Sequence, residues 1–376
     1  MTARAVVCAF GSGEAALWEG LLSGETRVAP CTALGGRRVA IVPLDSAGAD
    51  RTVALVREAA RQLQASAAWR AVQDRTPAAR LAVCLGTTQG AIQTWEHHQR
   101  QLAADAAHRP PLPHLADPTL ELARTLGARG AVQTLSMACA SGTAAIGLAA
   151  SWIEHGACDA AVAGGADAGS AFVYDGFAGL RALDPETPRP FDRERAGLGV
   201  GEGAALVLLQ RGRCGGAPLV AGFGLSADAH HLTGPDPTGG GLARAIGAAL
   251  ADAALAGEPQ TVDFVNAHGT ATVFNDLMES KALSLALGDH AARVPTNSIK
   301  GAIGHTMGAA GAIEAVLCAM VLERGVIPQT AGLRALDPAI TLDVVSGAPR
   351  RAEVRCALST SAGFGGINAA LLLRAA

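Results

Sequence analysis

The chain has 376 residues, of which 49% are hydrophobic and 17% are charged, and its formal net charge is −3. This composition excludes a disordered chain. The sequence has no cluster of Lys and Arg residues, which argues against nucleic acid or an acidic membrane as the main partner. No uncharged apolar run approaches the ~20 residues of a membrane span, and the apolar stretch before Gly11 is too short for a signal peptide, so we expect a cytoplasmic protein.

Short apolar runs alternate with helical patterns along the chain, which predicts an α/β architecture with buried sheets. The predicted strands are residues 81–85, 160–163, 205–209, 264–265 and 369–373. The predicted helices are residues 49–71, 141–155, 240–256, 276–286 and 309–324. The proline-rich residues 108–113 predict an irregular loop, and the glycine cluster at 214–218 marks a midpoint. We therefore expect two halves, 1–215 and 216–376.

One cysteine has a distinctive context among the eight in the chain. The cysteines are widely spaced and form no C-x-x-C pair, so neither a zinc site nor a disulfide framework is indicated. Cys139 comes directly before the Ala-rich helical pattern of residues 141–155. At a helix N-terminus, free N–H groups and the helix dipole favour thiolate over thiol and can stabilise an oxyanion. A reactive nucleophile is the functional interpretation, and a buried structural cysteine is the alternative.

Two histidines lie in loops rich in small residues. His268 follows a predicted strand and precedes residues 269–272 (GTAT), and His305 lies in a similar loop before a helix. Neither loop supplies further ligands at metal-binding spacing, so no metal site is predicted. Two neutral imidazoles beside a thiol instead suit acyl transfer with carbanion formation, because their N–H groups can stabilise an enolate. Lys300 would add a positive charge nearby.

Six sequence motifs follow one another in a fixed order. They are MACASGTAAIG, RPFDRERAGLGVGEGAALVLL, GFGLSADAHHLTGPDPTGGG, VNAHGTATVFND, NSIKGAIGHTMGAAGAIE and SAGFGGINAALLL. Together they resemble the elongating β-ketoacyl-[acyl-carrier-protein] synthases of the type II kind, which are condensing enzymes of the thiolase fold. The resemblance covers roughly residues 80–376. It implies a thiolase-like five-layer αβαβα sandwich built from two pseudo-repeated halves, with the nucleophile in 1–215 and both histidines in 216–376.

The resemblance implies a decarboxylative Claisen condensation in fatty-acid or specialised polyketide or polyene synthesis. Cys139 would take an acyl group from the phosphopantetheine thiol of an acyl carrier protein and form a thioester. Malonyl-carrier protein would then lose carbon dioxide while His268 and His305 hold its thioester oxygen. The enolate would attack the Cys139 thioester and give 3-oxoacyl-acyl carrier protein. No cofactor and no metal are implied.

Further residues receive supporting roles from the same resemblance. Lys300 and Glu314 would support the site by charge and hydrogen bonding. The backbone N–H groups of Cys139 and Phe364 would form the oxyanion hole. Phe364 and Asp228 would belong to two gate loops that move between acyl transfer and condensation, with glycines permitting the motion.

The substrate-binding positions include a departure from the family pattern. Thr270 and Thr272 occupy the positions that bind the pantetheine arm. Where the family commonly has Arg-Asp-Gly-Phe, this chain has Leu198 at the fourth position, which predicts an altered acyl pocket. The chain is also short at its N-terminus and in residues 108–126, a region that in relatives shapes the dimer contact and the tunnel end. Ala370 replaces the histidine of many polyketide synthases, which slightly favours the fatty-acid-like branch.

The resemblance also implies the assembly and leaves two other functions open. The expected partners are an acyl carrier protein and a second subunit, in a homodimer or a ketosynthase-type heterodimer. One alternative is a chain-length-factor-like partner subunit; such subunits typically replace the nucleophile, so Cys139 argues against it. The other is a degradative thiolase acting on coenzyme A esters. It needs a second cysteine in a late Cys-x-Gly loop, and Cys356 lacks that context.

Overall fold

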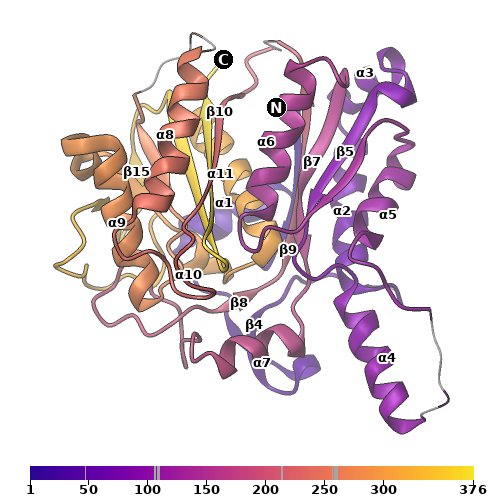
Figure 1. Cartoon of the computed structure of the whole chain (residues 1–376), viewed down its shortest axis with the longest axis horizontal. Helices are drawn as coiled ribbons and strands as arrows, with labels where there is room; N and C mark the ends of the chain where they lie inside the picture. Colours follow the sequence, from indigo (N-terminus) through magenta and orange to yellow (C-terminus); the bar gives the residue numbers. More distant parts are fainter. Residues whose placement is uncertain (47, 106, 108–110, 213–214, 256, 258–260) are drawn as a thin grey trace.

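The computed structural model contains two six-stranded sheets separated and covered by helices (Figure 1). It describes the whole chain except residues 47, 106, 108–110, 213–214, 256 and 258–260. The first three residues of the predicted loop at 108–113, the start of the glycine cluster at 214–218 and the last residue of the predicted helix 240–256 therefore lie outside the described residues.

The first sheet has the strand order β2-β1-β9-β7-β5-β6. Its strands are β1 (Ala3–Cys8), β2 (Gly11–Ser12), β5 (Leu81–Gly86), β6 (Val132–Leu135), β7 (Ala160–Asp167) and β9 (Gly203–Gln210). β5 pairs in parallel with both β6 and β7, whereas β9 is antiparallel to β7 and β1. Every residue of β5 and β7 is buried, which explains why both strands are apolar up to the last residue of β7, Asp167.

The second sheet has the order β10-β17-β16-β11-β12-β14. Its strands are β10 (Leu219–Ala227), β11 (Phe264–Asn266), β12 (Pro295–Asn297), β14 (Asp343–Val344), β16 (Cys356–Gly363) and β17 (Ile367–Arg374). All five strands predicted from the sequence are present in one sheet or the other, so these predictions are confirmed.

The helices form three layers around the sheets. The middle layer is α6 (Ser141–Glu154) with α11 (Ala310–Arg324), which contacts both β9 and β16. On the outer faces, α2 (Arg51–Gln64) and α5 (Asp117–Leu126) cover the first sheet, and α8 (Gly240–Leu255) and α9 (Val273–Leu287) lie beside the second (Figure 1). The predicted five-layer αβαβα sandwich is confirmed.

Small residues allow the middle helices to approach closely. The first twelve residues of α11 are buried, so this helix is apolar on all sides rather than on one stripe. A Cβ atom on Gly311 of α11 would lie 1.8 Å from Oγ1 of Thr143 on α6. Glycine at position 311 therefore permits the close contact between the two buried helices.

The predicted helix 49–71 is wrong as a single element. The structure has α2, then a break at Ala65 and Ser66, then α3 (Ala67–Arg75). Ser66 is extended, and its hydroxyl accepts a hydrogen bond from the backbone N–H of Trp69, so it caps a new helix. The apolar periodicity continues across the break, which is why the pattern alone joined the two helices.

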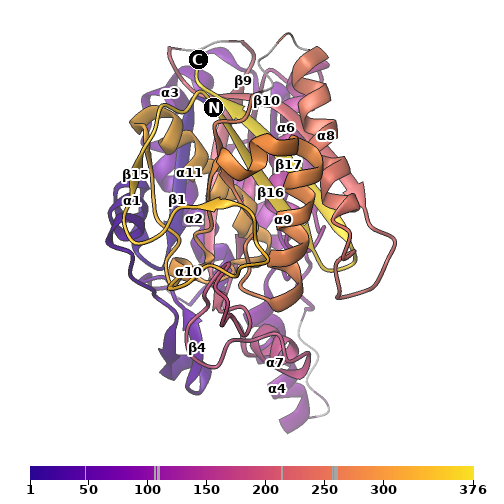
Figure 2. The same ribbon diagram turned by 90° about the vertical axis from the view of Figure 1, so that its left-hand side faces the viewer.

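Several further elements complete the described chain. They are α1 (Glu14–Ser23), β3 (Ala29–Cys31), η1 (Thr32–Leu34), β4 (Arg37–Ala40), η2 (Ala78–Arg80), α4 (Ile92–Ala104), α7 (Ala171–Gly179), β8 (Val200–Gly201), η3 (Gly288–Arg293), α10 (Lys300–Ile303), η4 (Met307–Ala309), β13 (Val326–Ile327) and β15 (Arg350–Arg351). The two termini lie at one end of the molecule, and α4 and α7 lie at the other (Figures 1 and 2). Among the described helices, none has the length and apolarity needed to cross a membrane.

Candidate active site

The thiol of Cys139 stands in a tight turn ahead of α6. The residue before it, Ala138, has a left-handed φ of 48°, a conformation that non-glycine residues adopt at a cost and mostly at functional sites. The Ser141 hydroxyl closes the turn, since it donates to the Ala138 carbonyl (2.6 Å) and accepts from the Met137 N–H (2.8 Å). Cys139 is 8% exposed and lines the pocket described below.

The electrostatics of this thiol differ from the sequence-based expectation. Burial raises the pKa of Cys139 to about 11, although Lys300 and the backbone N–H groups of Phe364 and Cys139 oppose the rise. The predicted lowering of the pKa is therefore wrong for the resting site, because desolvation outweighs the helix N-terminus. The backbone N–H groups of Phe364 and Cys139 that oppose the rise are the pair predicted to form the oxyanion hole.

Two histidines face this sulfur from loops of the second half of the chain. His268 follows β11, and His305 lies between α10 and η4. Their ring centroids are 5.3 Å apart at an interplanar angle of 83°. The sulfur of Cys139 and one nitrogen from each ring all lie within 4.8 Å of one another. The structure thus brings together the three residues singled out by the sequence.

Hydrogen bonds on Nδ1 determine the tautomer of both rings. The Lys300 ammonium lies 3.3 Å from Nδ1 of His268, and the Met307 backbone N–H donates to Nδ1 of His305 at 3.1 Å. Because neither an ammonium nor a backbone N–H can accept, each Nδ1 is an acceptor and each Nε2 carries the proton. Nε2 of His305 is buried without a hydrogen-bond partner among the described residues. Both imidazoles therefore offer an N–H to a bound group.

Burial keeps both imidazoles neutral. It lowers the pKa of His268 and of His305 well below 6.5, and the positive charge of Lys300 lowers both pKa values further. Neutral rings match the expectation from the sequence. A neutral ring can donate a hydrogen bond to a developing oxyanion without first losing a proton.

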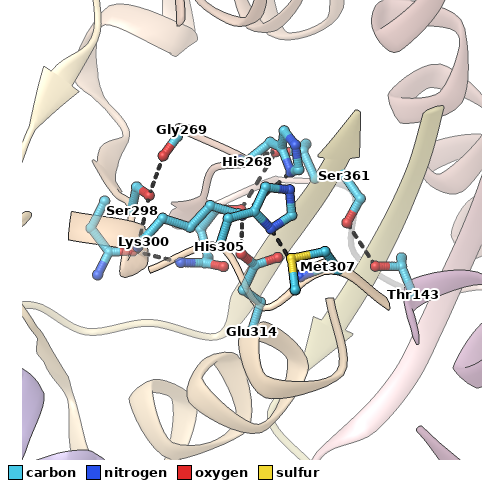
Figure 3. A network of polar contacts seen from close by, with 12 residues as sticks. Thr143, His268, Gly269, Ser298, Lys300, His305, Met307, Glu314 and Ser361 are labelled. Carbon is cyan, nitrogen blue, oxygen red and sulfur yellow. Dashed lines mark hydrogen bonds and ion pairs between the residues drawn. The ribbon is translucent and has the colours of Figure 1, made fainter. Parts of the chain in front are cut away.

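The Lys300 ammonium is paired with the Glu314 carboxylate behind His268. These side chains come from α10 and α11 and are 2% and 1% exposed (Figure 3). Burial raises the pKa of Glu314, whereas the Lys300 charge opposes that rise. A second bond fixes the start of α10, since the Lys300 N–H donates to the Ser298 hydroxyl, which donates to the Gly269 carbonyl. The ammonium is therefore held at Nδ1 of His268.

A buried carboxylate supports the His268 loop. One Glu279 oxygen accepts the His268 N–H and the other accepts the Gly269 N–H, both at 2.7 Å. Thr360 on β16 also donates to Glu279 at 2.7 Å. Sequence reasoning missed Glu279, although it lies one helical turn beyond the VNAHGTATVFND motif.

A metal ion could in principle be offered one thiol and two imidazoles, those of Cys139, His268 and His305. Among the described residues this is the one group of potential metal ligands. A metal needs the unprotonated lone pair of an imidazole nitrogen. Here each Nδ1 lone pair is already occupied and each Nε2 carries its proton. The residues are therefore arranged to donate hydrogen bonds and fit a metal ion poorly.

A pocket of about 520 Å³, including its mouth, opens onto these groups. Its lining contains eight residues predicted from the sequence: Cys139, Leu198, Asp228, His268, Thr270, Thr272, His305 and Phe364. Lys300 and Glu314 are not in its lining and act from behind His268. The lining also contains residues that sequence reasoning missed: Phe177, Thr233, Gly234, Pro235, Asn275, Ala362, Gly363, Gly366 and Asn368. Most of these belong to the quoted motifs, but no sequence signal marks Phe177.

The two predicted gate loops are joined across the pocket. Asn368 donates to the Asp228 carboxylate at 2.7 Å, the Asp228 N–H donates to the Gly366 carbonyl at 2.7 Å, and the Gly365 N–H donates to the Leu232 carbonyl at 2.7 Å. Gly366 has a φ of 70°, and a Cβ there would lie 2.8 Å from the Cβ of Asp228. The contact between the loops therefore requires glycine.

Aromatic and aliphatic side chains form the remaining walls. The Phe364 ring packs edge-on against Phe177 of α7, with centroids 5.7 Å apart. Leu198 is 3% exposed and belongs to an apolar cluster with Val200 and Met307. The hydroxyls of Thr270 and Thr272 lie 2.9 Å apart at the pocket.

Comparisons with known proteins agree along the whole chain. Residues 1–213 match the family described as "Beta-ketoacyl synthase, N-terminal domain", and residues 218–334 match "Beta-ketoacyl synthase, C-terminal domain". The polyketide beta-ketoacyl synthase 1 of Streptomyces cyaneus is 36% identical over 411 residues, covering 99% of this chain and 97% of the relative.

Two solved structures are similar over 100% of this chain and 98% of their own. One is described as the ishigamide ketosynthase/chain length factor, with 32% identity and a TM-score of 0.91. The other is a type II PKS acyl-carrier protein in complex with its ketosynthase bound to the hexaketide, with 26% identity and a TM-score of 0.89.

We predict that alkylation of Cys139 by iodoacetamide accelerates with pH up to about 11, because burial raises the pKa of this thiol to about 11 and only the thiolate reacts. Peptide mass spectrometry between pH 6 and 10 measures the rate. Cys31, the one described cysteine that is not buried, is the internal reference for reagent reactivity. A rate for Cys139 that levels off below pH 8 would show a preformed thiolate.

We also predict that Lys300→Met lowers the free energy of unfolding by about 3–5 kcal/mol, because it leaves the buried Glu314 carboxylate unpaired. The double variant Lys300→Met/Glu314→Leu removes both charges and regains most of this loss. Urea unfolding measures each difference. A double variant that is no more stable than Lys300→Met would contradict a charge-pairing origin.

Proposed function

Because the chain belongs to the β-ketoacyl synthase family, we propose that it is an acyltransferase, a 3-oxoacyl-[acyl-carrier-protein] synthase. It is a condensing enzyme that extends a carrier-bound acyl chain in fatty-acid or specialised polyketide or polyene synthesis. The observation that carries the proposal is that the Cys139 sulfur and one nitrogen from each of the two neutral imidazoles lie within 4.8 Å of one another in a single pocket.

The first half-reaction loads the acyl chain on Cys139. The sulfur attacks the thioester carbonyl of the acyl carrier protein, and the pantetheine thiolate leaves and takes up the proton that Cys139 loses. The backbone N–H groups of Cys139 and Phe364 would hold the oxygen of the tetrahedral intermediate. The product is an acyl thioester on Cys139.

The second half-reaction forms the new carbon–carbon bond. The malonyl thioester loses carbon dioxide, and the electron pair of the broken bond forms an enolate whose oxygen accepts the Nε2–H groups of His268 and His305. The enolate carbon attacks the carbonyl carbon of the Cys139 thioester, and the sulfur leaves as a thiolate that takes a proton from solvent. Lys300 would act through His268 by holding its tautomer, with Glu314 holding Lys300.

Other predicted residues act on access and specificity under this proposal. Thr270 and Thr272 would bind the pantetheine arm, and the loops of Asp228 and Phe364 would gate the pocket. Leu198 would shape the acyl chamber. Each is supported by its place in the pocket lining.

The proposal includes the partners and the organisation of the chain. An acyl carrier protein would deliver both substrates, as supported by the similar structure of a ketosynthase with its carrier protein. A second subunit would complete a homodimer or a ketosynthase-type heterodimer, and the cytoplasm would be its location. We also propose the division into a nucleophile half, 1–215, and a histidine half, 216–376.

A second candidate, a chain-length-factor-like partner subunit, is favoured by the similarity to the structure of a ketosynthase/chain length factor. Cys139 and its oxyanion-hole N–H groups argue against it, because they have no use in a subunit without condensing activity. The test is incubation with a panel of acyl-carrier proteins, followed by the mass added to Cys139. Acylation supports the synthase, and a chain that never acquires mass at Cys139 would support the alternative.

We predict that His305→Ala retains acylation of Cys139 but loses condensation by about 100–1,000-fold, the typical cost of one oxyanion donor. Intact-protein mass spectrometry follows acylation, and mass spectrometry of the carrier-bound product follows condensation. His97→Ala, which alters an exposed histidine on α4, is the matched control and keeps both steps. Condensation by His305→Ala at the wild-type rate would refute the enolate role.

A further inference from the structure

A buried carboxylate at the end of β7 contacts the turn that follows His305. Asp167 is fully buried, and its Oδ2 atom accepts the Gly308 backbone N–H at 2.7 Å. The same carboxylate accepts hydrogen bonds from the loop after β5: from the Thr87 hydroxyl (2.6 Å), from the Thr88 N–H and hydroxyl (2.9 and 2.7 Å) and from the Gln89 N–H (3.2 Å). Asp167 therefore links the first sheet to a loop of the second half.

The turn at residues 305–309 is held tightly from several sides. A Cβ atom on Gly308 would lie 2.7 Å from the Asp167 carboxylate. Cβ atoms on Gly165 of β7 and on Gly142 of α6 would lie 2.2 and 2.7 Å from the Gly308 carbonyl oxygen. Gly308 thus lies against three segments of the first half, and its N–H group has Asp167 as its acceptor.

The same turn contains a strained residue with a direct contact to the site. Met307 has a left-handed φ of 47°, which is unfavourable for a side chain with a Cβ and persists only where the surroundings impose it. In this conformation its N–H points at Nδ1 of His305, at 3.1 Å. That bond is what leaves the proton on Nε2 of His305. If the Met307 backbone moved to a favourable conformation, Nδ1 of His305 would lose its donor and the ring could carry its proton on Nδ1 instead.

We propose that Asp167 is a positioning residue that fixes the tautomer of His305 through Gly308 and the strained Met307. The inference rests on the proposed function, in which Nε2–H of His305 donates to the malonyl-derived enolate. Asp167 touches neither sulfur nor substrate and acts only through the turn. In this way a residue of the first half orients a hydrogen-bond donor of the second half.

The geometry indicates which substitutions separate this role from general loop support. Asp167→Ala removes the acceptor of Gly308. Asp167→Asn keeps one oxygen, which can occupy the Oδ2 position and accept from both Gly308 and Thr88. Its amide then takes the Oδ1 position, where the Thr87 hydroxyl must turn to accept a hydrogen bond and the Gln89 N–H loses its acceptor. Thr88→Val removes one hydroxyl bond to Asp167 and leaves the Gly308 bond intact.

The test compares two partial reactions and one spectroscopic signal in the full-length protein. Acylation of Cys139 by acyl-carrier protein is followed by intact mass, and decarboxylation of malonyl-carrier protein by released carbon dioxide. We expect Asp167→Ala to lose decarboxylation by about 100-fold relative to acylation, the order of effect of misplacing a group by ~1 Å. For Asp167→Asn the ratio of decarboxylation to acylation should stay within about threefold of the wild-type ratio. Thr88→Val should have the wild-type ratio.

The tautomer is measured directly by long-range proton–nitrogen NMR of protein labelled at histidine, with the His305 signals assigned by their loss in His305→Ala. The wild type should show the Nε2–H form, and Asp167→Ala should show a gain of the Nδ1–H form. A wild-type Nδ1–H form overturns the proposal even if Asp167→Ala does not fold. An unchanged ratio of the two reactions in folded Asp167→Ala, or an equal loss in Thr88→Val, also overturns it.

Failure of the proposed function would look different. A wild-type protein that neither acylates Cys139 nor decarboxylates malonyl-carrier protein would refute the synthase activity. The tautomer measurement would still decide whether Asp167 sets the state of His305.

Discussion

The arrangement of this site depends on one repeated interaction, a donor placed on Nδ1 of each buried histidine. An ammonium serves His268, and a backbone N–H serves His305. The two donors reach the rings by different routes, one through the ion pair between α10 and α11 and the other through a strained turn. The result is the same on both rings, because each keeps its proton on Nε2. The five-layer fold brings the two rings together in one pocket.

Burial also keeps the thiol and the two imidazoles of the resting site uncharged. The pKa of the thiol rises to about 11 and the pKa of each imidazole falls well below 6.5, all with burial as the main cause. The charges of Lys300 and Glu314 neutralise each other behind His268. Negative charge then arises only during reaction, beside N–H groups that are already oriented. Such preorganisation avoids the cost of rearranging solvent when charge develops.

The sequence predicted the parts of this structure that local pattern determines. Continuous apolar runs predicted five strands, and the motifs singled out the thiol, the two histidines, Lys300 and Glu314. The sequence did not predict the features that depend on tertiary contacts. The cap at Ser66 divides a helix whose periodicity is unbroken, and the direction of the Cys139 pKa depends on burial that no motif reports. Phe177 enters the pocket only because α7 lies across the Phe364 loop. Asp167 acts through a backbone N–H, which leaves no trace in a pattern of side chains.

If the loops of Asp228 and Phe364 gate the pocket, as proposed above, the three hydrogen bonds between them set a threshold for access. Each such bond contributes roughly 0.5–1.5 kcal/mol net, so separating the loops costs about 2–4 kcal/mol if all three break together. An opening of that cost is populated at roughly 0.1–3%, and a ligand that needs the open form binds more weakly by the same fraction. A carrier protein that contacted the loops could recover this loss. The interlocked loops would then discriminate between a cargo presented on its carrier and the same cargo free in solution.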